Sequence, residues 1–183
     1  MNLHLGCGKR FLSGFIHIDL ADYKHIDYKH DVKTLPIFKD STVNLIYASH
    51  VIEYFDRNEI VEILREWRRV LKEGGILRLA VPSFGALVHV YIKYKSLAPI
   101  RGPLYGEWEI PGTDKRIYHK TVYDYSSLEA ILNEVGFNNI RRWDWRDVFV
   151  GEHEGFDDYS QSYIPHMDKE HGILISLNVE AEK

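Results

Sequence analysis

The chain has 183 residues, 45% of them apolar, and a formal net charge of −4. This size and composition suit one globular domain over residues 1–183. A large basic footprint for nucleic acid is absent, and no apolar run reaches the roughly 20 residues that span a membrane. The first six residues lack a signal-peptide pattern and Cys7 is the single cysteine, so we expect a cytoplasmic protein without disulfides.

Short β-like runs alternate with helical periods, which indicates a mainly parallel sheet with connecting helices. Only about nine residues separate the first two strands, so a tight loop or one helical turn must replace a full crossover helix. Asp56 and Glu59 predict the start of a helix, and Gly74-Gly75 its end. Strands are predicted at 3–5, 15–20, 43–48, 76–81, 138–143 and 173–179, and helices at about 60–71, 84–94 and 126–135.

Two segments interrupt this alternation. Residues 97–120 mix proline and glycine with Tyr105, Trp108 and Tyr118, which predicts an aromatic insertion over the sheet. Residues 144–171 hold eight acidic and two basic residues, a formal charge of −6. We expect both segments to form a lid over a substrate. The alternatives are packing of the aromatic residues onto the sheet and an ordinary solvated acidic loop.

The turn Gly6-Cys7-Gly8 follows the first strand, and glycine there lets a backbone approach a ligand closely. In open α/β sheets, ligands bind beyond the carboxyl ends of the strands. The next glycine is Gly14, so the full spacing of a dinucleotide-binding turn is absent. Cys7 is expected to fill the turn as a small side chain.

Two aspartates follow at later strand and loop ends. Asp19 ends the second predicted strand, where a carboxylate can accept hydrogen bonds from ribose hydroxyls. Asp31 follows a polar loop and can accept from an adenine amino group, while Val32 packs on the ring. The alternatives are a strand-end turn residue for Asp19 and a turn or helix-cap aspartate for Asp31.

In this order, and together with Val43–Tyr54 and Val70–Gly75, these residues resemble the class I S-adenosylmethionine-dependent methyltransferases. The resemblance implies a Rossmann-like, three-layer α/β/α fold whose seven-stranded, mainly parallel sheet has its last strand antiparallel. It also implies S-adenosylmethionine as cofactor and S-adenosylhomocysteine as product. Three features depart from the family: His4 stands where an acid is often found, the helix after the glycine turn is shortened, and the helix before the first strand is missing. Carried over by position, the cofactor contacts are Leu5, Gly6, Cys7, Gly8, Asp19, Leu20, Asp31, Val32, Ala48, Ser49 and His50.

Methyl transfer to an oxygen requires alignment and a base, and histidine suits that role near neutral pH. His119, at the end of the insertion, is the first candidate and His50 the second, while Tyr123 is a candidate to orient a substrate hydroxyl. Each has a structural alternative, and Glu53 is expected to be structural. No metal site is predicted, because the histidines and acids of residues 153–171 match no ligand spacing.

The sequence therefore predicts a methyltransferase acting on a small-molecule acceptor, with a hydroxyl of a sugar or related metabolite as the expected group. Two alternatives stay open. One is a non-catalytic S-adenosylmethionine-binding subunit of a larger complex, and the other is a Rossmann-like enzyme using another nucleotide. No nucleic-acid partner is expected, and a homodimer is compatible with the sequence.

Overall fold

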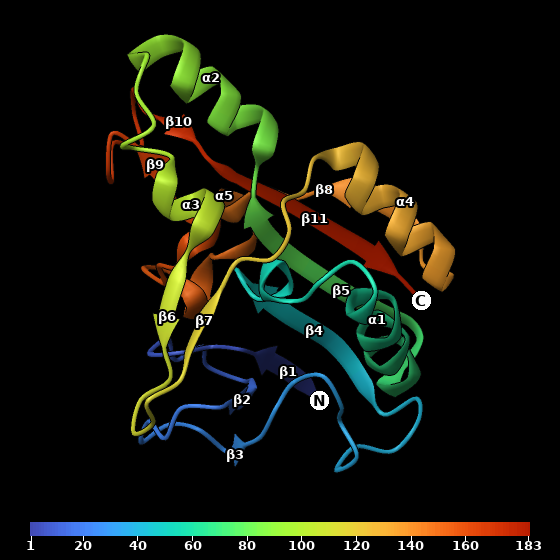
Figure 1. Cartoon of the computed structure of the whole chain (residues 1–183). Coiled ribbons are helices and arrows are strands. Elements are labelled where there is room, and N and C mark those ends of the chain that lie inside the picture. Colours follow the sequence, from blue (N-terminus) through green and yellow to red (C-terminus); the bar gives the residue numbers. More distant parts are fainter.

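The computed structural model describes residues 1–183 and contains one seven-stranded sheet in the order β3-β2-β1-β4-β5-β11-β8 (Figure 1). Neighbouring strands from β3 to β5 are parallel, whereas β11 is antiparallel to both β5 and β8. The predicted sheet is therefore confirmed, including the antiparallel direction of the last strand in the chain. The strands are β1 (Asn2–Leu5), β2 (Ile16–Asp19), β3 (Tyr28–Lys29), β4 (Val43–Ser49), β5 (Leu71–Pro82), β8 (Asn138–Arg142) and β11 (Ser176–Glu182).

Two helices, α1 (Glu59–Val70) and α4 (Tyr125–Val135), cover one face of this sheet (Figure 1). Alternate strand residues point toward them and form the main hydrophobic core. At the start of α1, Asp56 Oδ1 accepts from the Glu59 N–H at 3.1 Å, and Glu59 Oε2 accepts from the Asp56 N–H at 3.2 Å. This reciprocal pair is the predicted capping arrangement.

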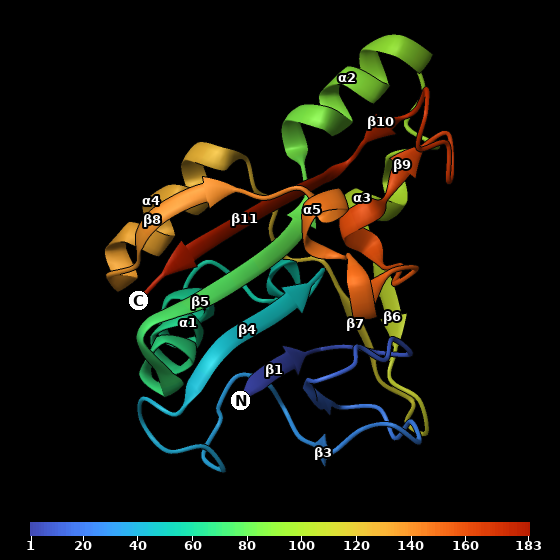
Figure 2. The ribbon, with the colours of Figure 1, turned by 180° about the vertical axis from the view of Figure 1, so that it is seen from behind.

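The opposite face has no long helix. Residues 6–15, between β1 and β2, form only turns and loops, as their short length predicted. Residues from the acidic segment cover this face instead, through the short helices α5 (Trp145–Val148), η2 (Gly151–His153) and η3 (Tyr159–Gln161) (Figure 2). Phe149 and Phe156 pack there around Tyr47. The second helical layer is thus reduced to single turns.

Between β5 and α4 the chain leaves the sheet and returns. It forms α2 (Phe84–Tyr94), α3 (Arg101–Tyr105) and the hairpin of β6 (Glu107–Glu109) and β7 (Arg116–Tyr118). Figures 1 and 2 both show this hairpin running past the carboxyl ends of β1 and β4. None of the helices has the length and apolar character needed to cross a membrane.

Two predicted boundaries were wrong. Helix α1 ends at Val70, and Gly74-Gly75 lies inside β5, where the register with β4 shifts. The last predicted strand is divided into β10 (Ile173–Leu174), which pairs with β9 (Tyr163–Ile164), and β11, which extends to Glu182. Glycines and short apolar runs mark breaks in structure, but they do not say on which side of the break a strand begins.

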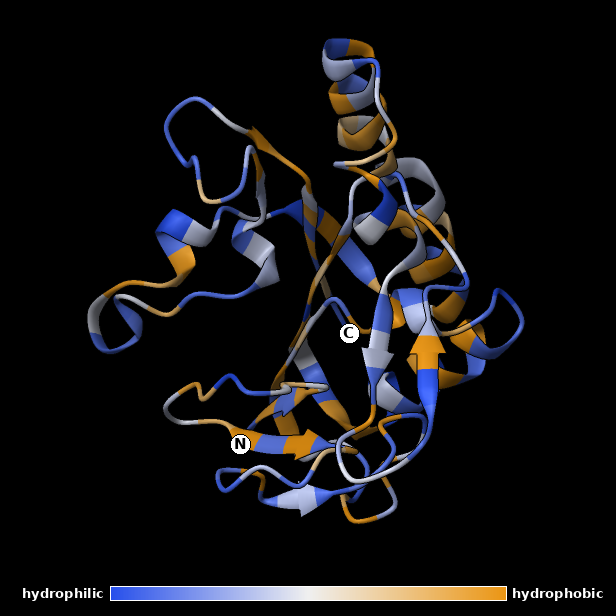
Figure 3. Ribbon diagram, turned by 60° about the vertical axis from the view of Figure 1, so that its left-hand side comes forward, coloured by the Kyte–Doolittle hydropathy of each residue, from blue (hydrophilic) through white to orange (hydrophobic).

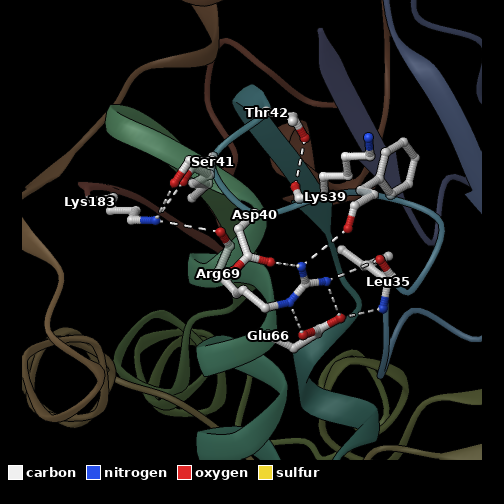
Figure 4. A network of polar contacts seen from close by, with 10 residues as sticks. Leu35, Lys39, Asp40, Ser41, Thr42, Glu66, Arg69 and Lys183 are labelled. Carbon is white, nitrogen blue, oxygen red and sulfur yellow. Dashed lines mark hydrogen bonds and ion pairs between the residues drawn. The ribbon is translucent and has the colours of Figure 1, made fainter.

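A polar network fixes the loop between β3 and β4 to α1 (Figure 4). Arg69 bonds the Glu66 carboxylate and the carbonyl oxygens of Leu35 and Phe38, and it also pairs with Asp40. In return, the Leu35 N–H donates to Glu66 at 2.7 Å. This network holds the loop that begins with Asp31 and Val32.

Candidate cofactor and active site

The carboxyl ends of three neighbouring strands bring the predicted cofactor residues together. Leu5 of β1 is in register with Ile18 of β2 and with Ala48 of β4. The next residue on each strand is therefore Gly6, Asp19 or Ser49, at one edge of the sheet. This edge is where ligands bind in open parallel sheets.

The glycine turn has two positions with left-handed backbone, Gly6 at φ +60° and Gly8 at φ +54°. A Cβ atom on Gly6 would lie 2.5 Å from Val51 Cγ2, whereas a Cβ on Gly8 would meet no heavy atom within 4 Å. Gly6 thus packs the turn against the end of β4, and Gly8 faces open space. Cys7 is buried between them, and burial raises the pKa of its thiol to about 12, with a further contribution from the Asp19 charge. That thiol stays protonated and fills the turn.

The carboxylate of Asp19, only 3% exposed, ties the glycine turn to the loop after β2. Its Oδ2 accepts from the Gly8 N–H at 2.8 Å and its Oδ1 from the Ala21 N–H at 2.7 Å. Each carboxylate oxygen keeps a further lone pair that a hydroxyl could use. Leu20 follows and is half-buried.

The second acidic position lies in the loop held by α1. Asp31 is half-buried, and its Oδ1 accepts from the Lys33 N–H at 3.0 Å. The Val32 side chain packs into the main core, and its carbonyl accepts from the Trp67 indole at 2.7 Å. Asp31 is thus positioned by a buried neighbour on a fixed loop.

At the end of β4 the chain enters a constrained turn. Ala48 is buried in the core, and the Ser49 hydroxyl is buried as well. His50 has φ +55°, a conformation that is costly for a residue with a side chain and is common at functional turns. Its N–H donates to the Ala80 carbonyl at 2.8 Å, and its ring Nε2 is buried without a hydrogen-bond partner.

A buried carboxyl group lies between two histidines at this turn. Glu53, on the 3₁₀ helix η1 (Ile52–Tyr54), is fully buried. Its Oε1 lies 3.3 Å from His50 Nδ1 and 3.9 Å from His119 Nε2. The His119 ring is fixed because its Nδ1–H donates to the Pro103 carbonyl at 2.9 Å. Gly106 allows this close packing, since a Cβ there would overlap the ring.

Burial governs the protonation of these three groups. It raises the pKa of Glu53 to about 8. Burial, and then the proximity of His119, lowers the pKa of His50 to about 3, and burial also lowers the pKa of His119. Near neutral pH the cluster is uncharged overall, with a protonated carboxyl between two neutral imidazoles.

Three tyrosines surround the cluster. Tyr123 is buried, and its hydroxyl lies 3.5 Å from the Ile52 carbonyl, to which it donates. The Tyr54 ring is 4.7 Å from that of His119, and the Tyr159 ring is 5.2 Å from that of His50. His119 comes from the aromatic insertion and Tyr159 from the acidic segment, so both predicted lid segments reach the end of β4.

Sequence reasoning gave Glu53 only a structural role. Its partner His119 is far along the chain, and no local pattern signals that the two side chains meet. The signal that was available is an acid three residues after His50, since this spacing in a tight turn lets both side chains face one another. No group of three His, Cys, Asp or Glu side chains has an arrangement that could hold a metal ion.

A cavity of about 600 Å³ opens at the end of α2. Its walls come from the end of α2, the segment before α3, residues 162–166 and the start of β11. One wall is Pro103, whose carbonyl fixes His119. No Asp, Glu, Lys or Arg lines the cavity. The lining residues are Tyr94, Ser96, Pro99, Pro103, Ser162, Tyr163, Ile164, Pro165, His166 and Ile175.

The sheet order and the site at its carboxyl edge define the fold of a class I S-adenosylmethionine-dependent methyltransferase. Residues 3–79 match a family model described as a methyltransferase domain. This match and this fold confirm the resemblance of the sequence to the class I S-adenosylmethionine-dependent methyltransferases, whose cofactor is S-adenosylmethionine. The alternative of a Rossmann-like enzyme using another nucleotide is therefore set aside.

Solved structures share this fold at low sequence identity. A S-adenosylmethionine-dependent methyltransferase from Archaeoglobus fulgidus is 17% identical with a TM-score of 0.57, and the alignment covers 100% of this chain and 85% of that one. One from Methanosarcina mazei is 16% identical, with a TM-score of 0.58 and coverages of 99% and 91%. A protein from Thermotoga maritima described as a possible histamine N-methyltransferase is 15% identical, with a TM-score of 0.55 and coverages of 100% and 81%. The curated proteins include no sequence that matches the chain.

The residues at the carboxyl edge fit this cofactor. Gly8 leaves open space beside the turn, Asp19 offers a carboxylate at the end of β2, and the buried Ser49 hydroxyl has no hydrogen-bond partner. His4 occupies the position of the missing acid. It lies on the second face of the sheet, among Phe15, Tyr47 and Phe156, and it cannot supply a negative charge there.

Proposed function

We propose that this methyltransferase acts on a hydroxyl of a small, uncharged acceptor and that His50 Nε2 is the base. The observation that supports this most strongly is the buried His50–Glu53–His119 cluster beside the glycine turn. S-adenosylmethionine would supply an electrophilic methyl group when bound. The chain's own residues would then have to hold the cofactor, align the acceptor and remove one proton.

For cofactor binding, the proposal keeps the predicted contacts at the strand ends. Gly6, Cys7 and Gly8 would form the backbone wall, Asp19 would accept from the ribose hydroxyls, and Asp31 with the peptide of Val32 would face the adenine. Leu5, Leu20, Ala48 and Ser49 would complete the surface around these contacts. Charge-assisted hydrogen bonds of the kind proposed for Asp19 are the stronger ones in proteins.

One arrangement of protons leaves His50 ready to act as a base. His119 Nδ1–H donates to Pro103, so His119 Nε2 is free to accept from a protonated Glu53. The same oxygen, Oε1, can accept from His50 Nδ1–H through a remaining lone pair, and this leaves His50 Nε2 bare. When Nε2 takes a proton, the Glu53 proton can pass to His119, and the carboxylate then stabilises the charged His50. In this proposal His119, the first candidate from the sequence, positions the proton of Glu53.

The cavity at the end of α2, which is linked to the cluster through Pro103, supports an uncharged acceptor. Its volume of about 600 Å³ lies in the range of small-molecule sites. Because no charged side chain lines it, a phosphorylated or carboxylated acceptor would lose hydration without gaining a partner. Tyr, Pro and Ser side chains offer flat surfaces and hydroxyls, which suit a sugar ring or a related polyol. The aromatic insertion and the acidic segment would form the lid of this site.

The test combines binding with transfer. Calorimetric titration of the wild type and of His50→Gln with S-adenosylhomocysteine should give the same affinity. Transfer of labelled methyl groups to a panel of neutral glycosides should fall about 10²-fold or more in His50→Gln. His89→Gln, on the exposed surface of α2, is the matched control and should behave like the wild type.

Three outcomes would contradict the proposal. Equal activity of His50→Gln and the wild type would show that His50 is not the base. Transfer to phosphorylated sugars in preference to the neutral glycosides would overturn the acceptor class. Tight binding of S-adenosylhomocysteine without transfer to any acceptor would favour the non-catalytic subunit over the enzyme.

A further inference from the structure

The exposed side of α2 and the residues after it form an apolar face. It consists of Phe84, Val88, Tyr91, Ile92, Tyr94 and Leu97, each between 38% and 61% exposed. Figure 3 shows α2 with its apolar residues standing clear of the sheet. So many large apolar side chains exposed within 14 residues mark a surface that another body covers.

The same helix is firmly attached to the protein on its other side. Leu87 and Val90 are buried against Ile100 and Ile175. A shallow groove of about 200 Å³ separates α2 from α3, and all of its lining side chains are apolar. The apolar face is thus held by a packed helix, and its exposure does not come from a loose end.

The charged side chains of α2 and α3 are all basic. No Asp or Glu occurs between Glu73 and Glu107, while Lys93, Lys95 and Arg101 are exposed at the border of the apolar face. Residues 84–106 therefore have a formal charge of +3 in a chain of net charge −4. The loop after β9 lines one cavity with the end of α2, and its Asp168, Lys169 and Glu170 together lower the summed formal charge from +3 to +2.

We propose that the apolar face of α2 lies on an anionic lipid bilayer. Apolar and aromatic side chains bordered by Lys and Arg are the features of helices that bind the plane of a membrane interface. The basic residues would lie at the level of anionic headgroups. The long aliphatic stems of Lys93 and Lys95 would extend along the boundary, with their ammonium groups in water.

A second copy of the chain fits this face less well. A two-fold dimer would bring together two copies of a patch whose formal charge is +3, so the basic residues of the two copies would repel one another. This face could instead contact the acidic segment of another copy, which is a head-to-tail interface. Such an interface adds further copies into an open filament unless the rotation closes a ring. Charge complementarity therefore favours the bilayer.

Sedimentation with vesicles tests the proposal on the full chain. Wild-type protein is mixed with one of two kinds of vesicle, at about 50 mM and 500 mM salt. The neutral vesicles contain phosphatidylcholine alone, and the anionic vesicles contain phosphatidylcholine with 30% phosphatidylglycerol. It should sediment with the anionic vesicles at low salt, at least tenfold more than with the neutral ones, and the difference should shrink at high salt.

Two double variants separate charge from apolar contact. Lys93→Glu with Lys95→Glu, and Ile92→Ser with Leu97→Ser, should each lose most of the binding. The control is Lys72→Glu with Val150→Ser, which makes the same kinds of change at exposed positions elsewhere and should bind like the wild type. Unchanged S-adenosylhomocysteine affinity and thermal midpoint show that all the variants are folded.

Other results would overturn the proposal. These are no binding to anionic vesicles at low salt, or equal binding by the two α2 variants and the control. Sedimentation velocity tests a further contradicting result, a stable dimer. If the double variant Ile92→Ser with Leu97→Ser dissociates that dimer, a second copy of the chain covers this face. None of these outcomes depends on the identity of the methyl acceptor.

Discussion

The Oε1 atom of Glu53 lies 3.3 Å from Nδ1 of His50, at the carboxyl end of β4. The Glu53 side chain is completely buried, and no Lys or Arg pairs with it. A carboxyl group in such a place is more stable protonated, because burial penalises its charged form. The Glu53 carboxyl group can therefore ionise when a neighbouring imidazole becomes positively charged. A histidine that acts as a general base needs such a negative charge beside it once it has taken up the proton.

Glu53→Gln should separate this role from stability. The amide oxygen can accept from His50 Nδ1–H, so the fold and the affinity for S-adenosylhomocysteine should be kept. It cannot become negative, so methyl transfer should fall about 10²-fold or more. The measurement is turnover and binding for both proteins, with Glu134→Gln on the exposed side of α4 as the control.

The pH dependence of stability gives an independent check on Glu53. The ordinary pKa of a glutamate side chain is 4.5, and burial raises the pKa of Glu53 to about 8 in the folded protein. A carboxyl group whose folded pKa is raised stabilises the protein at low pH, and this contribution is lost as pH rises from 4.5 to 8. The thermal midpoint of Glu53→Gln, minus that of the wild type, should therefore increase between pH 5 and pH 9. A constant difference would mean that Glu53 is already ionised at low pH.

Sequence order was enough to bring Gly6 and Asp19 to one edge of the sheet, and the reason is geometric. Gly6 and Asp19 each follow an apolar run, and parallel strands end on the same edge, so local patterns fix where these residues lie. The Glu53–His119 contact joins residues far apart in the chain through the hairpin after α3. Nothing in either local sequence encodes that approach, so it became visible only in the fold.

The second face of the sheet shows another limit of sequence reasoning. The acidic segment was read by its charge, yet its Phe149 and Phe156 cover the face that lacks long helices. Asp158 of the same segment is buried and accepts from the Tyr47 hydroxyl at 2.6 Å. Net charge describes the solvated residues of a segment and says little about the few side chains that attach it.

The two glycines of the turn should respond differently to alanine. Both would place a side chain at positive φ, at a cost of about 1–2 kcal/mol. In Gly6→Ala the new Cβ would also meet Val51, whereas in Gly8→Ala it would enter open space. We expect Gly6→Ala to be clearly less stable in urea than Gly8→Ala, and Gly8→Ala to remain folded with weakened binding of S-adenosylhomocysteine. Equal stabilities, or full affinity in Gly8→Ala, would contradict this account of the turn.

Asp19→Asn tests the carboxylate at the end of β2. An amide presents one acceptor oxygen, so either the Gly8 or the Ala21 N–H would lose its partner, at about 1–3 kcal/mol of stability. Affinity for S-adenosylhomocysteine should fall about 10-fold to 100-fold, measured by calorimetry. Asp22→Asn is the matched control, since that carboxylate is exposed and pairs only with Lys29. Unchanged affinity in Asp19→Asn would remove Asp19 from the cofactor site.

His4 should make the protein sensitive to acid. Burial, and then the proximity of His17 and His25, lowers the pKa of His4 from 6.5 to about 3, and its Nδ1 has no hydrogen-bond partner. The unfolded chain binds a proton near pH 6.5 that the folded protein excludes. The stability present above pH 6.5 is therefore lost as pH falls toward 3. Replacing His4 by leucine keeps an apolar side chain among the same aromatic rings and removes this titration.

The urea midpoints of wild type and His4→Leu should be close at pH 7.5 and diverge at pH 4.5, with the variant more stable by about 1–3 kcal/mol. The pKa of His17 is also lowered and that of Glu53 is raised, but both groups are present in both proteins. The effect of Glu53 therefore cancels in the difference, and that of His17 changes only through its contact with the His4 ring, 5.6 Å away between centroids. His89→Leu, at an exposed site, should follow the wild type across this range. Parallel pH curves for His4→Leu and the wild type would mean that His4 can be protonated within the fold, and that the second face of the sheet is open to water.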